Sequence, residues 1–265
     1  MKTFSIFALV FAFLSTLVPA SGEEAKHLRV LCYNIHYGQG NDGVYDIERL
    51  ARVINESQPD IVALQEVDVV VERSGKVHQA RKLGELTGMA VRYGPTQHYQ
   101  GGLYGNAILT KLPILDVLIH PLPYTEATPE KTTYPRAAIA VTMEGINGKP
   151  FRFISTHFQH NLEEDRIEQA KAINQLFADN IPTILAGDMN SVPGSDPVAI
   201  LEEKWKHAGS EPLAPTAPSK EPRNRIDYIF YRPGESFRVV SENVIDEPMA
   251  SDHCPVFAEF AFSEK

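Results

Sequence analysis

The sequence has little cysteine and little positive charge. Two cysteines occur in 265 residues, and 25 Lys and Arg residues stand against 34 Asp and Glu residues, for a formal net charge of −9. So few cysteines exclude a small scaffold held together by disulfides. The acidic balance excludes a broad cationic field for nonspecific nucleic-acid binding, although it allows a local basic patch in a cleft. With 43% hydrophobic residues, the chain is long and apolar enough to bury a substantial core.

Long apolar runs are also scarce, and the only one lies at the start of the chain. Residues 4–18 are apolar except for two serines and a threonine, Lys2 precedes them, and Val18-Pro19-Ala20 offers small residues for cleavage. This pattern predicts a secretory signal peptide over residues 1–20, because the run is shorter than the roughly 20 residues of an uncleaved membrane anchor. We expect residues 21–265 to be secreted or periplasmic, with no transmembrane segment in the mature chain.

Several standard catalytic motifs are missing from the sequence. It contains no CxxC, no HExxH, no GxSxG and no Walker lysine. Residues 38–43 do fit GxGxxG, but a dinucleotide site needs a helix to begin inside that motif. Here Asn41, Asp42 and Gly43 disfavour a helix, and helical periodicity begins only near Asp46. We therefore interpret residues 38–43 as a flexible loop.

The two cysteines, Cys32 and Cys254, each lie beside polar residues of interest. Two buried thiols are favoured, and a single bridge stays open if the strands that carry them are neighbours. Their spacing does not indicate a metal site.

Short β-rich runs alternate with amphipathic helices along the rest of the chain. Strands are predicted at 28–33 and 61–65 around a helix at 46–57, which Asp46 can cap. Further strands are expected at 107–110, 114–120, 137–142, 151–156, 183–186, 226–231 and 256–260, and a second helix at 163–178. The excess of strands favours packed mixed sheets with helices outside. The proline-rich stretches 121–135 and 212–222 are interpreted as surface loops, so one domain is expected over 21–265.

Polar residues recur at the ends of these strands, where a scaffold presents catalytic groups. Each alone is a common turn or capping residue. Their joint occurrence beside apolar strands predicts a site formed by Asn34, Glu66, Asn106, His157, Asp188, Asn190, Asp227, Asp252 and His253.

The segments around these residues resemble the endonuclease/exonuclease/phosphatase family. The strongest similarities are Gln-Glu-Val at 65–67, Gly-Asp-Met-Asn at 187–190, Arg-Ile-Asp-Tyr at 225–228 and Ser-Asp-His at 251–253. The resemblance runs from Val30 to Val256. It implies a four-layer α/β sandwich of two packed mixed β-sheets flanked by helices. It also implies a site at one end of the sheets and hydrolysis of a phosphate ester with a divalent cation, usually Mg²⁺.

Roles follow from the residue types and from the resemblance. Hard oxygen ligands suit Mg²⁺, with Mn²⁺ as the alternative, and the expected ligands are Glu66, Asn34 and Asp252. The expected catalytic residues are His157, Asp188, Asn190, Asp227, His253 and Asn106. Asp188 is the candidate to orient or deprotonate water, beside Asn190, and protonated His157 and His253 are candidates to donate to phosphate oxygens. The resemblance pairs Asp227 with His157 and Asp252 with His253. Whether Asp188 or His253 is the general base stays open.

The expected substrate contacts are Arg73 and Arg136. Few other basic residues accompany them. Two arginines are enough to bind one phosphate group, but so few positive charges do not favour binding of a long polyanion such as DNA. After Asn34 the sequence Ile35-His36-Tyr37 lacks the acid that some nucleases carry, so a second metal site is in doubt.

These observations favour a secreted, monomeric, metal-dependent phosphoesterase, foremost a phosphodiesterase, acting on a small or lipid-linked phosphate ester. The alternative is a secreted nuclease, and the third hypothesis is a catalytically silent binding protein of the same fold. Diester and monoester substrates are both open.

Overall fold

The computed structural model describes residues 27–145, 147–232 and 236–262. The predicted signal peptide, residues 1–20, lies outside the described residues. Within them, no helix combines the length and apolar character needed to cross a membrane.

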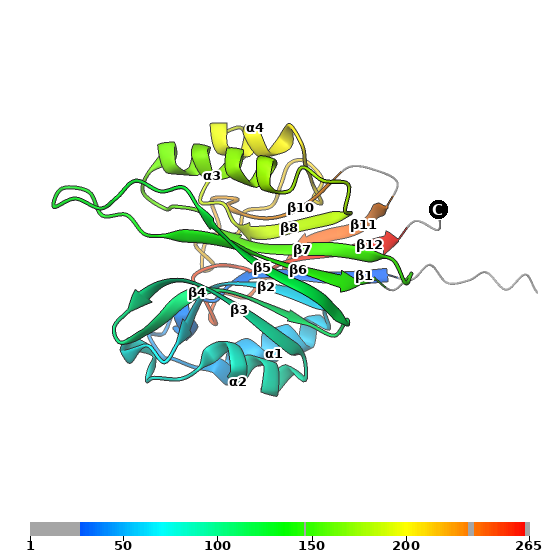
Figure 1. Cartoon of the computed structure of the whole chain (residues 1–265). Helices are drawn as coiled ribbons and strands as arrows, with labels where there is room; N and C mark the ends of the chain where they lie inside the picture. The colour runs from blue at the N-terminus through cyan, green and yellow to red at the C-terminus, as the bar shows by residue number, and fades with distance from the viewer. Residues whose placement is uncertain (1–26, 146, 233–235, 263–265) are drawn as a thin grey trace, which may run out of the picture.

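Two six-stranded mixed sheets pack face to face (Figure 1). The first sheet has the order β11 (Phe237–Val244), β12 (Val256–Phe262), β1 (His27–Asn34), β2 (Ile61–Val69), β4 (Gly102–Thr110) and β3 (Ala90–Tyr99). The second has the order β5 (Ile114–Leu122), β6 (Arg136–Glu144), β7 (Pro150–His157), β8 (Thr183–Asp188), β10 (Asp227–Tyr231) and β9 (Lys206–His207).

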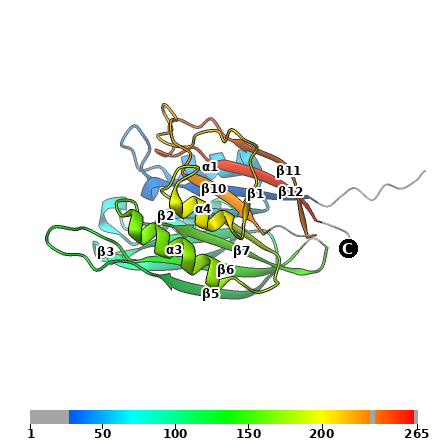
Figure 2. The ribbon, with the colours of Figure 1, turned by 90° about the horizontal axis from the view of Figure 1, so that it is seen from above.

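Helices cover the outer face of each sheet (Figures 1 and 2). The first sheet carries α1 (Ile47–Ser57) and α2 (Gln79–Thr87), and the second carries α3 (Glu163–Leu176) and α4 (Asp196–Glu202). Two short 3-10 turns, η1 (His36–Gly38) and η2 (Glu72–Ser74), follow β1 and β2. The four-layer sandwich predicted from the sequence is confirmed.

Strands in the middle of each sheet are buried on both faces. In β1, Val30 and Cys32 point into the core between the sheets, whereas Leu31 and Tyr33 pack under the outer helices. Side chains alternate across a strand, so burial of both faces requires the nearly continuous apolar runs seen in the sequence. Cys32 and Cys254 are both buried free thiols, as the sequence favoured.

Local sequence determines where the first helix, α1, begins and ends. The Asp46 carboxylate accepts a hydrogen bond from the Arg49 backbone N–H at 2.8 Å, and Gln58 ends the helix in the left-handed conformation. Such a cap stabilises a helix by about 1 kcal/mol. No helix begins within residues 38–43, and that loop is tied to the rest of the fold, because Asn41 Nδ2 donates to the Pro248 and Ser251 carbonyls.

Besides the two-residue strand β9, the sequence patterns missed the edge strands β3 and β11. Both have much of their length exposed and carry many polar side chains, so the apolar alternation that signals a strand is weak there. The short helices α2 and α4 were also not anticipated.

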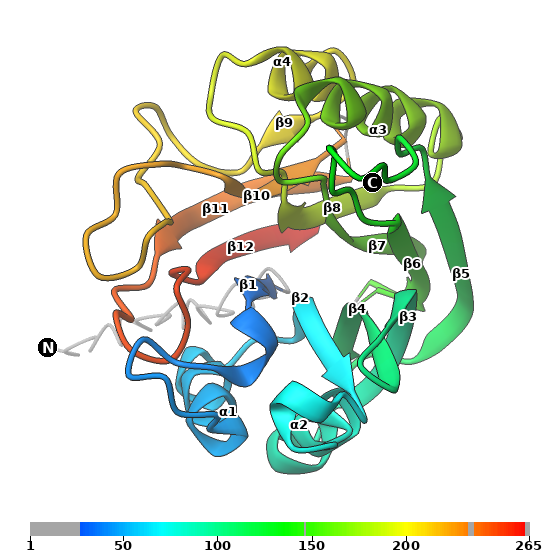
Figure 3. The same ribbon diagram turned by 90° about the vertical axis from the view of Figure 1, so that its left-hand side faces the viewer.

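The strand order brings the predicted site residues to one end of the sandwich, which Figure 3 shows face-on. β1 runs parallel to β2, and β7 runs parallel to β8, so each pair ends at the same edge of its sheet. Asn34 lies beside Gln65, and His157 lies beside Asp188. Asp227, at the start of antiparallel β10, lies directly opposite Asp188.

Because both sheets share one apolar core, we propose a single domain that unfolds in one transition. Phe153 is fully buried between the sheets, and Phe153→Ala should lower the free energy of unfolding by about 3–5 kcal/mol. Leu115→Ala, at a side chain 58% exposed on β5, is the control and should change it by less than about 0.5 kcal/mol. Denaturation followed by fluorescence and circular dichroism tests this, and two separate transitions would contradict it.

Candidate functional site

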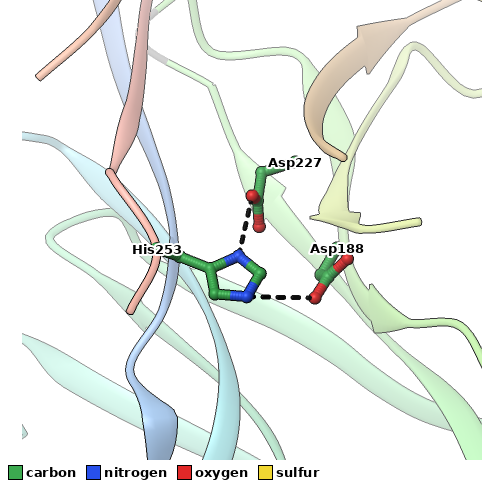
Figure 4. A group of neighbouring side chains, drawn as sticks. All are labelled: Asp188, Asp227 and His253. Carbon is green, nitrogen blue, oxygen red and sulfur yellow. Dashed lines mark hydrogen bonds and ion pairs between the residues drawn. The ribbon is translucent and has the colours of Figure 1, made fainter. Parts of the chain in front are cut away.

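Two aspartates and a histidine form the buried centre of the site (Figure 4). His253 Nδ1 lies 2.9 Å from Asp227 Oδ2, and His253 Nε2 lies 3.9 Å from Asp188 Oδ2. Each aspartate is only 1% exposed. Ligand atoms from all three residues fall within 4.8 Å of one another, so the group can hold a metal ion.

Burial and mutual charge set the protonation of this centre. Burial, together with the negative charge of Asp227, raises the pKa of Asp188 to about 7. Burial alone would lower the pKa of His253, but the charge and hydrogen bond of Asp227 and the charge of Asp188 outweigh it and hold that pKa well above its usual value. The stable arrangement at neutral pH is therefore a charged His253 between two carboxyl groups.

The predicted pairing of aspartates with histidines was wrong. Asp227 bonds to His253, and Asp252 lies beside His36, with 3.8 Å between Asp252 Oδ1 and His36 Nδ1. His157 Nε2 instead lies 3.4 Å from Asp188 Oδ2. Burial and the charge of Arg136 place the pKa of His157 well below its usual value, so this imidazole is neutral rather than protonated as expected.

Glu66 reaches the site through an irregularity in β2. The register between β2 and β4 shifts between Leu64 and Val67, and Glu66 adopts a left-handed backbone with φ of 58°. This conformation costs a non-glycine residue about 1–2 kcal/mol and often occurs at functional sites. The preceding Gln65 is anchored between the sheets, where its Nε2 donates to Ser155 Oγ at 3.1 Å. Glu66 is thereby presented to the cavity.

Asn34 connects the carboxylates of the two sheets. Its Nδ2 donates to Glu66 Oε1 at 3.1 Å and to Asp188 Oδ2 at 3.0 Å, while its Oδ1 accepts the His36 backbone N–H at 3.0 Å. Asn34 and Glu66 as metal ligands stay predictions, because no contact here tests them. So does Asp252, whose side chain is 41% exposed and does not line the cavity.

The two other predicted asparagines have different positions. Asn190 lines the cavity, and its backbone N–H donates to Asp188 Oδ1 at 2.8 Å, which fixes the orientation of that carboxyl group. Asn106 is buried on β4, away from the cavity lining, and its Nδ2 donates to the Ala137 carbonyl at 3.0 Å. Asn106 therefore braces the start of β6, next to Arg136.

A cavity of about 280 Å³ opens over this centre. Residues of both sheets form its walls, namely Glu66, Arg73, Gln97, Tyr99, Tyr104, Tyr134, Arg136, His157, His160, Asp188, Asn190 and His253. The tyrosines, Gln97 and His160 were not anticipated. Tyr99 and Gln97 lie on the polar edge strand β3, and Tyr134 lies in a loop, where periodicity carries no signal.

The two predicted arginines differ in how their charge is balanced. Arg73 forms a double hydrogen bond with buried Asp68, at 2.9 and 3.0 Å, and stacks 3.6 Å from the centre of the Tyr37 ring. Arg136 is 5% exposed, lines the cavity together with Tyr104, and has no carboxylate within ion-pair distance among the residues described. Its Nε also lacks a partner there. A buried guanidinium without a counterion is suited to binding an anion.

Both a family model and solved structures of other proteins match this chain. A sequence model described as the "Endonuclease/Exonuclease/phosphatase family" matches residues 31–253. A crystal structure of an endonuclease/exonuclease/phosphatase from Beutenbergia cavernae is similar, with 25% identity and a TM-score of 0.76 over 89% of this chain and 72% of that one.

Two further solved structures share the fold. A mannosyl-6-phosphatase of Bacteroides thetaiotaomicron is 21% identical, with a TM-score of 0.71 over 89% of this chain and 100% of that one. The human Nocturnin catalytic domain is also 21% identical, with a TM-score of 0.65 over 89% and 95% of the two chains.

The raised pKa of Asp188 predicts a pH-dependent stability of the protein in EDTA. Between its unfolded value near 4 and its folded value near 7, the folded state holds a proton that the unfolded state loses, so stability falls as pH rises. Each pKa unit corresponds to about 1.4 kcal/mol. Asp188→Asn removes this proton, and its stability should fall less between pH 4 and 7 than that of the wild type.

Denaturant unfolding at pH 4, 5.5 and 7 measures this difference. Asp116→Asn, at an exposed position of β5, is the matched control and should retain the wild-type slope. Parallel slopes for wild type and Asp188→Asn would contradict the assignment.

Proposed function

The chain belongs to the endonuclease/exonuclease/phosphatase family, and from this premise we propose that it is a metal-dependent phosphoesterase acting on a compact phosphate ester. The family consists mostly of metal-dependent phosphoesterases. One observation carries the proposal: buried Arg136, which lacks a counterion among the described residues, shares a cavity with the group of Asp188 and His253. An anion bound at Arg136 would lie beside groups able to activate water.

The residues of the site fit a divalent cation. Carboxylate oxygens are the ligands that Mg²⁺ prefers, and buried Asp227 Oδ1 has no hydrogen-bond partner in the described structure. The described structure brings ligand atoms of Asp188, Asp227 and His253 together, whereas Glu66, Asn34 and Asp252 stay the ligand set predicted from the sequence. When bound, the cation would neutralise phosphate charge and polarise the phosphorus–oxygen bonds.

The protonation states suggest which residue acts as base. A pKa near 7 lets Asp188 accept the proton of an attacking water at working pH, and the Asn190 N–H holds the carboxyl in one orientation. Charged His253, held by Asp227, is suited to donate a hydrogen bond to a nonbridging phosphate oxygen. We therefore favour Asp188 over His253 as the general base. Water oxygen would bond to phosphorus as the ester oxygen leaves.

The charged residues that surround the Asp188–Asp227–His253 group favour a small or lipid-linked ester over nucleic acid. Asp68 already balances the charge of Arg73, so Arg136 is the one cavity arginine without a carboxylate partner in the described residues. The net charge of −9 opposes a long polyanion. The structural neighbour named as a mannosyl-6-phosphatase supports a small phosphate ester. We also propose that residues 1–20 direct export and that the enzyme acts as a monomer.

Hydrolysis of p-nitrophenyl phosphate and of bis(p-nitrophenyl) phosphate should require Mg²⁺ or Mn²⁺ and stop with EDTA. Asp188→Asn and His253→Ala should each lower kcat by about 10² or more, the scale of losing one catalytic group. Asp116→Asn is the control. Full activity in both site variants would refute the assigned centre, and no activity on any ester would favour a silent binding protein.

Plasmid DNA tests the alternative nuclease. We expect little cleavage, because the described cavity offers few free cations. Efficient cleavage that falls steeply with added salt would replace the proposed substrate class, since phosphate-backbone binding depends strongly on salt.

Measurements of metal binding can distinguish the two candidate ligand sets without any measurement of activity. We expect Glu66→Gln to weaken Mn²⁺ binding by about tenfold or more, because Glu66 faces the cavity and is not held by a charged histidine. Asp227→Asn should weaken it less. Calorimetric titration of both variants measures the difference, and the reverse order would assign the ion to Asp188, Asp227 and His253.

A further inference from the structure

The cavity has an aromatic wall that the chemistry at Asp188 does not use. Tyr134 and His160 stack on one another with ring centres 5.6 Å apart and planes 29° apart, and both line the cavity. Tyr134 lies two residues before Arg136, and His160 lies three residues after His157. The stacked pair therefore adjoins both the anion-binding arginine and the catalytic end of β7.

Hydrogen bonds hold this stacked pair in place. Gln159 Nε2 donates to the Tyr134 carbonyl at 3.3 Å, which links the two segments that carry the rings. Arg166 Nη1 donates to the Gln159 and His160 carbonyls at 3.2 and 3.0 Å. The rings are thus preorganised, so a ligand that packs against them need not order them first.

His160 contributes an uncharged ring to this wall. Burial, together with the charges of Arg136 and Arg166, lowers its pKa below the usual value. A neutral imidazole presents a polarisable face and one donor and one acceptor nitrogen, which suits a ligand with both apolar and hydroxyl surface better than a second anion.

The opposite wall comes from the β3–β4 hairpin. Tyr99 and Tyr104 line it, with the Arg73 guanidinium 4.7 Å from the Tyr99 ring centre. The β3–β4 turn and the β5–β6 connection, which carries Tyr134, both extend from the left-hand end of the molecule in Figure 1. The cavity between them is rimmed by polar groups, among them Gln97.

We propose that the stacked Tyr134–His160 pair binds the leaving group of the substrate and selects a sugar ring, so that the ester hydrolysed is a sugar phosphate. A pyranose has an apolar C–H face that packs on an aromatic ring and a hydroxyl rim that needs polar partners. Tyr134 and His160 supply the face, and Gln97 and His160 supply polar atoms. The cavity, about 280 Å³, is slightly smaller than the roughly 300–1,000 Å³ of typical ligand pockets, which suits one ring.

A nucleobase fits this wall less well. The two rings contact each other rather than standing apart as a slot into which a planar base could slide. Nucleotides are therefore the competing ligand in the test, and acyclic glycerol phosphate is the ligand that has no ring to stack. The sugar assignment rests on the proposed function, because it takes the phosphate at Arg136 as the reacting group.

Binding by the full chain carrying Asp188→Asn, with Mg²⁺ present, tests the assignment without turnover. Calorimetry should show glucose 6-phosphate binding about tenfold more tightly than glycerol 3-phosphate and than AMP. Adding Tyr134→Ala should lower the glucose 6-phosphate to glycerol 3-phosphate affinity ratio five- to tenfold, the value of one ring contact. His160→Ala should lower it similarly, and Tyr134→Phe should preserve it.

Tyr124→Ala, an exposed tyrosine of the same connection that does not line the cavity, is the matched control and should leave the ratio unchanged. Tighter binding of AMP, equal binding of both phosphates, or an equal loss for both in Tyr134→Ala would overturn the sugar assignment. Hydrolysis of aryl phosphates by the wild type separates the two proposals. Activity without ring preference would overturn the sugar assignment and leave the proposed function intact. Ring-dependent binding without any hydrolysis would overturn the proposed function and leave the stacked pair as a binding site for a sugar phosphate, not a leaving-group site.

Discussion

The site depends on the burial of two like charges in register. Asp188 and Asp227 lie directly opposite each other on neighbouring strands, and each is 1% exposed. Two buried carboxylates repel each other and lose hydration, so one must be protonated or a cation must lie between them. Charged His253 supplies part of that compensation, and donors from Asn34 and Thr216 supply more. A divalent cation would complete it, which is why the same geometry suits metal-assisted chemistry.

The remaining features hold this charged centre between two sheets. Asn34 and Gln65 come from one sheet, and each forms hydrogen bonds to a residue of the other. The left-handed Glu66 backbone is kept in place by its anchored neighbour Gln65 rather than by local preference. The two arginines of the cavity differ in the same way. Asp68 holds Arg73 in the cavity wall by an ion pair, whereas Arg136 has no such partner in the described structure and is available to bind an anion.

Most of the fold could be predicted from the sequence, since central strands buried on both faces need continuous apolar runs and helices need a 3.6-residue period. The edge strands β3 and β11 could not, because their polar, partly exposed sequences show little apolar alternation, and β9 is only two residues long. The identity of the polar residues at the strand ends was also predictable, and nine of the eleven named site residues, all but Asn106 and Asp252, line the cavity or hydrogen-bond to a residue that does.

The sequence by itself determined which residue types are available: carboxylates, amides, histidines and two arginines at or near the ends of apolar strands. Only the tertiary structure decided which of them interact. Asp227 meets His253 rather than His157, and His157 is neutral while His253 is charged, because strand order and burial set these distances and pKa values. Tyr134 and His160 likewise become one wall only when two loops meet. Electrostatic energies depend on the distance between groups and on their access to solvent, and neither quantity can be obtained from the order of residues along the chain.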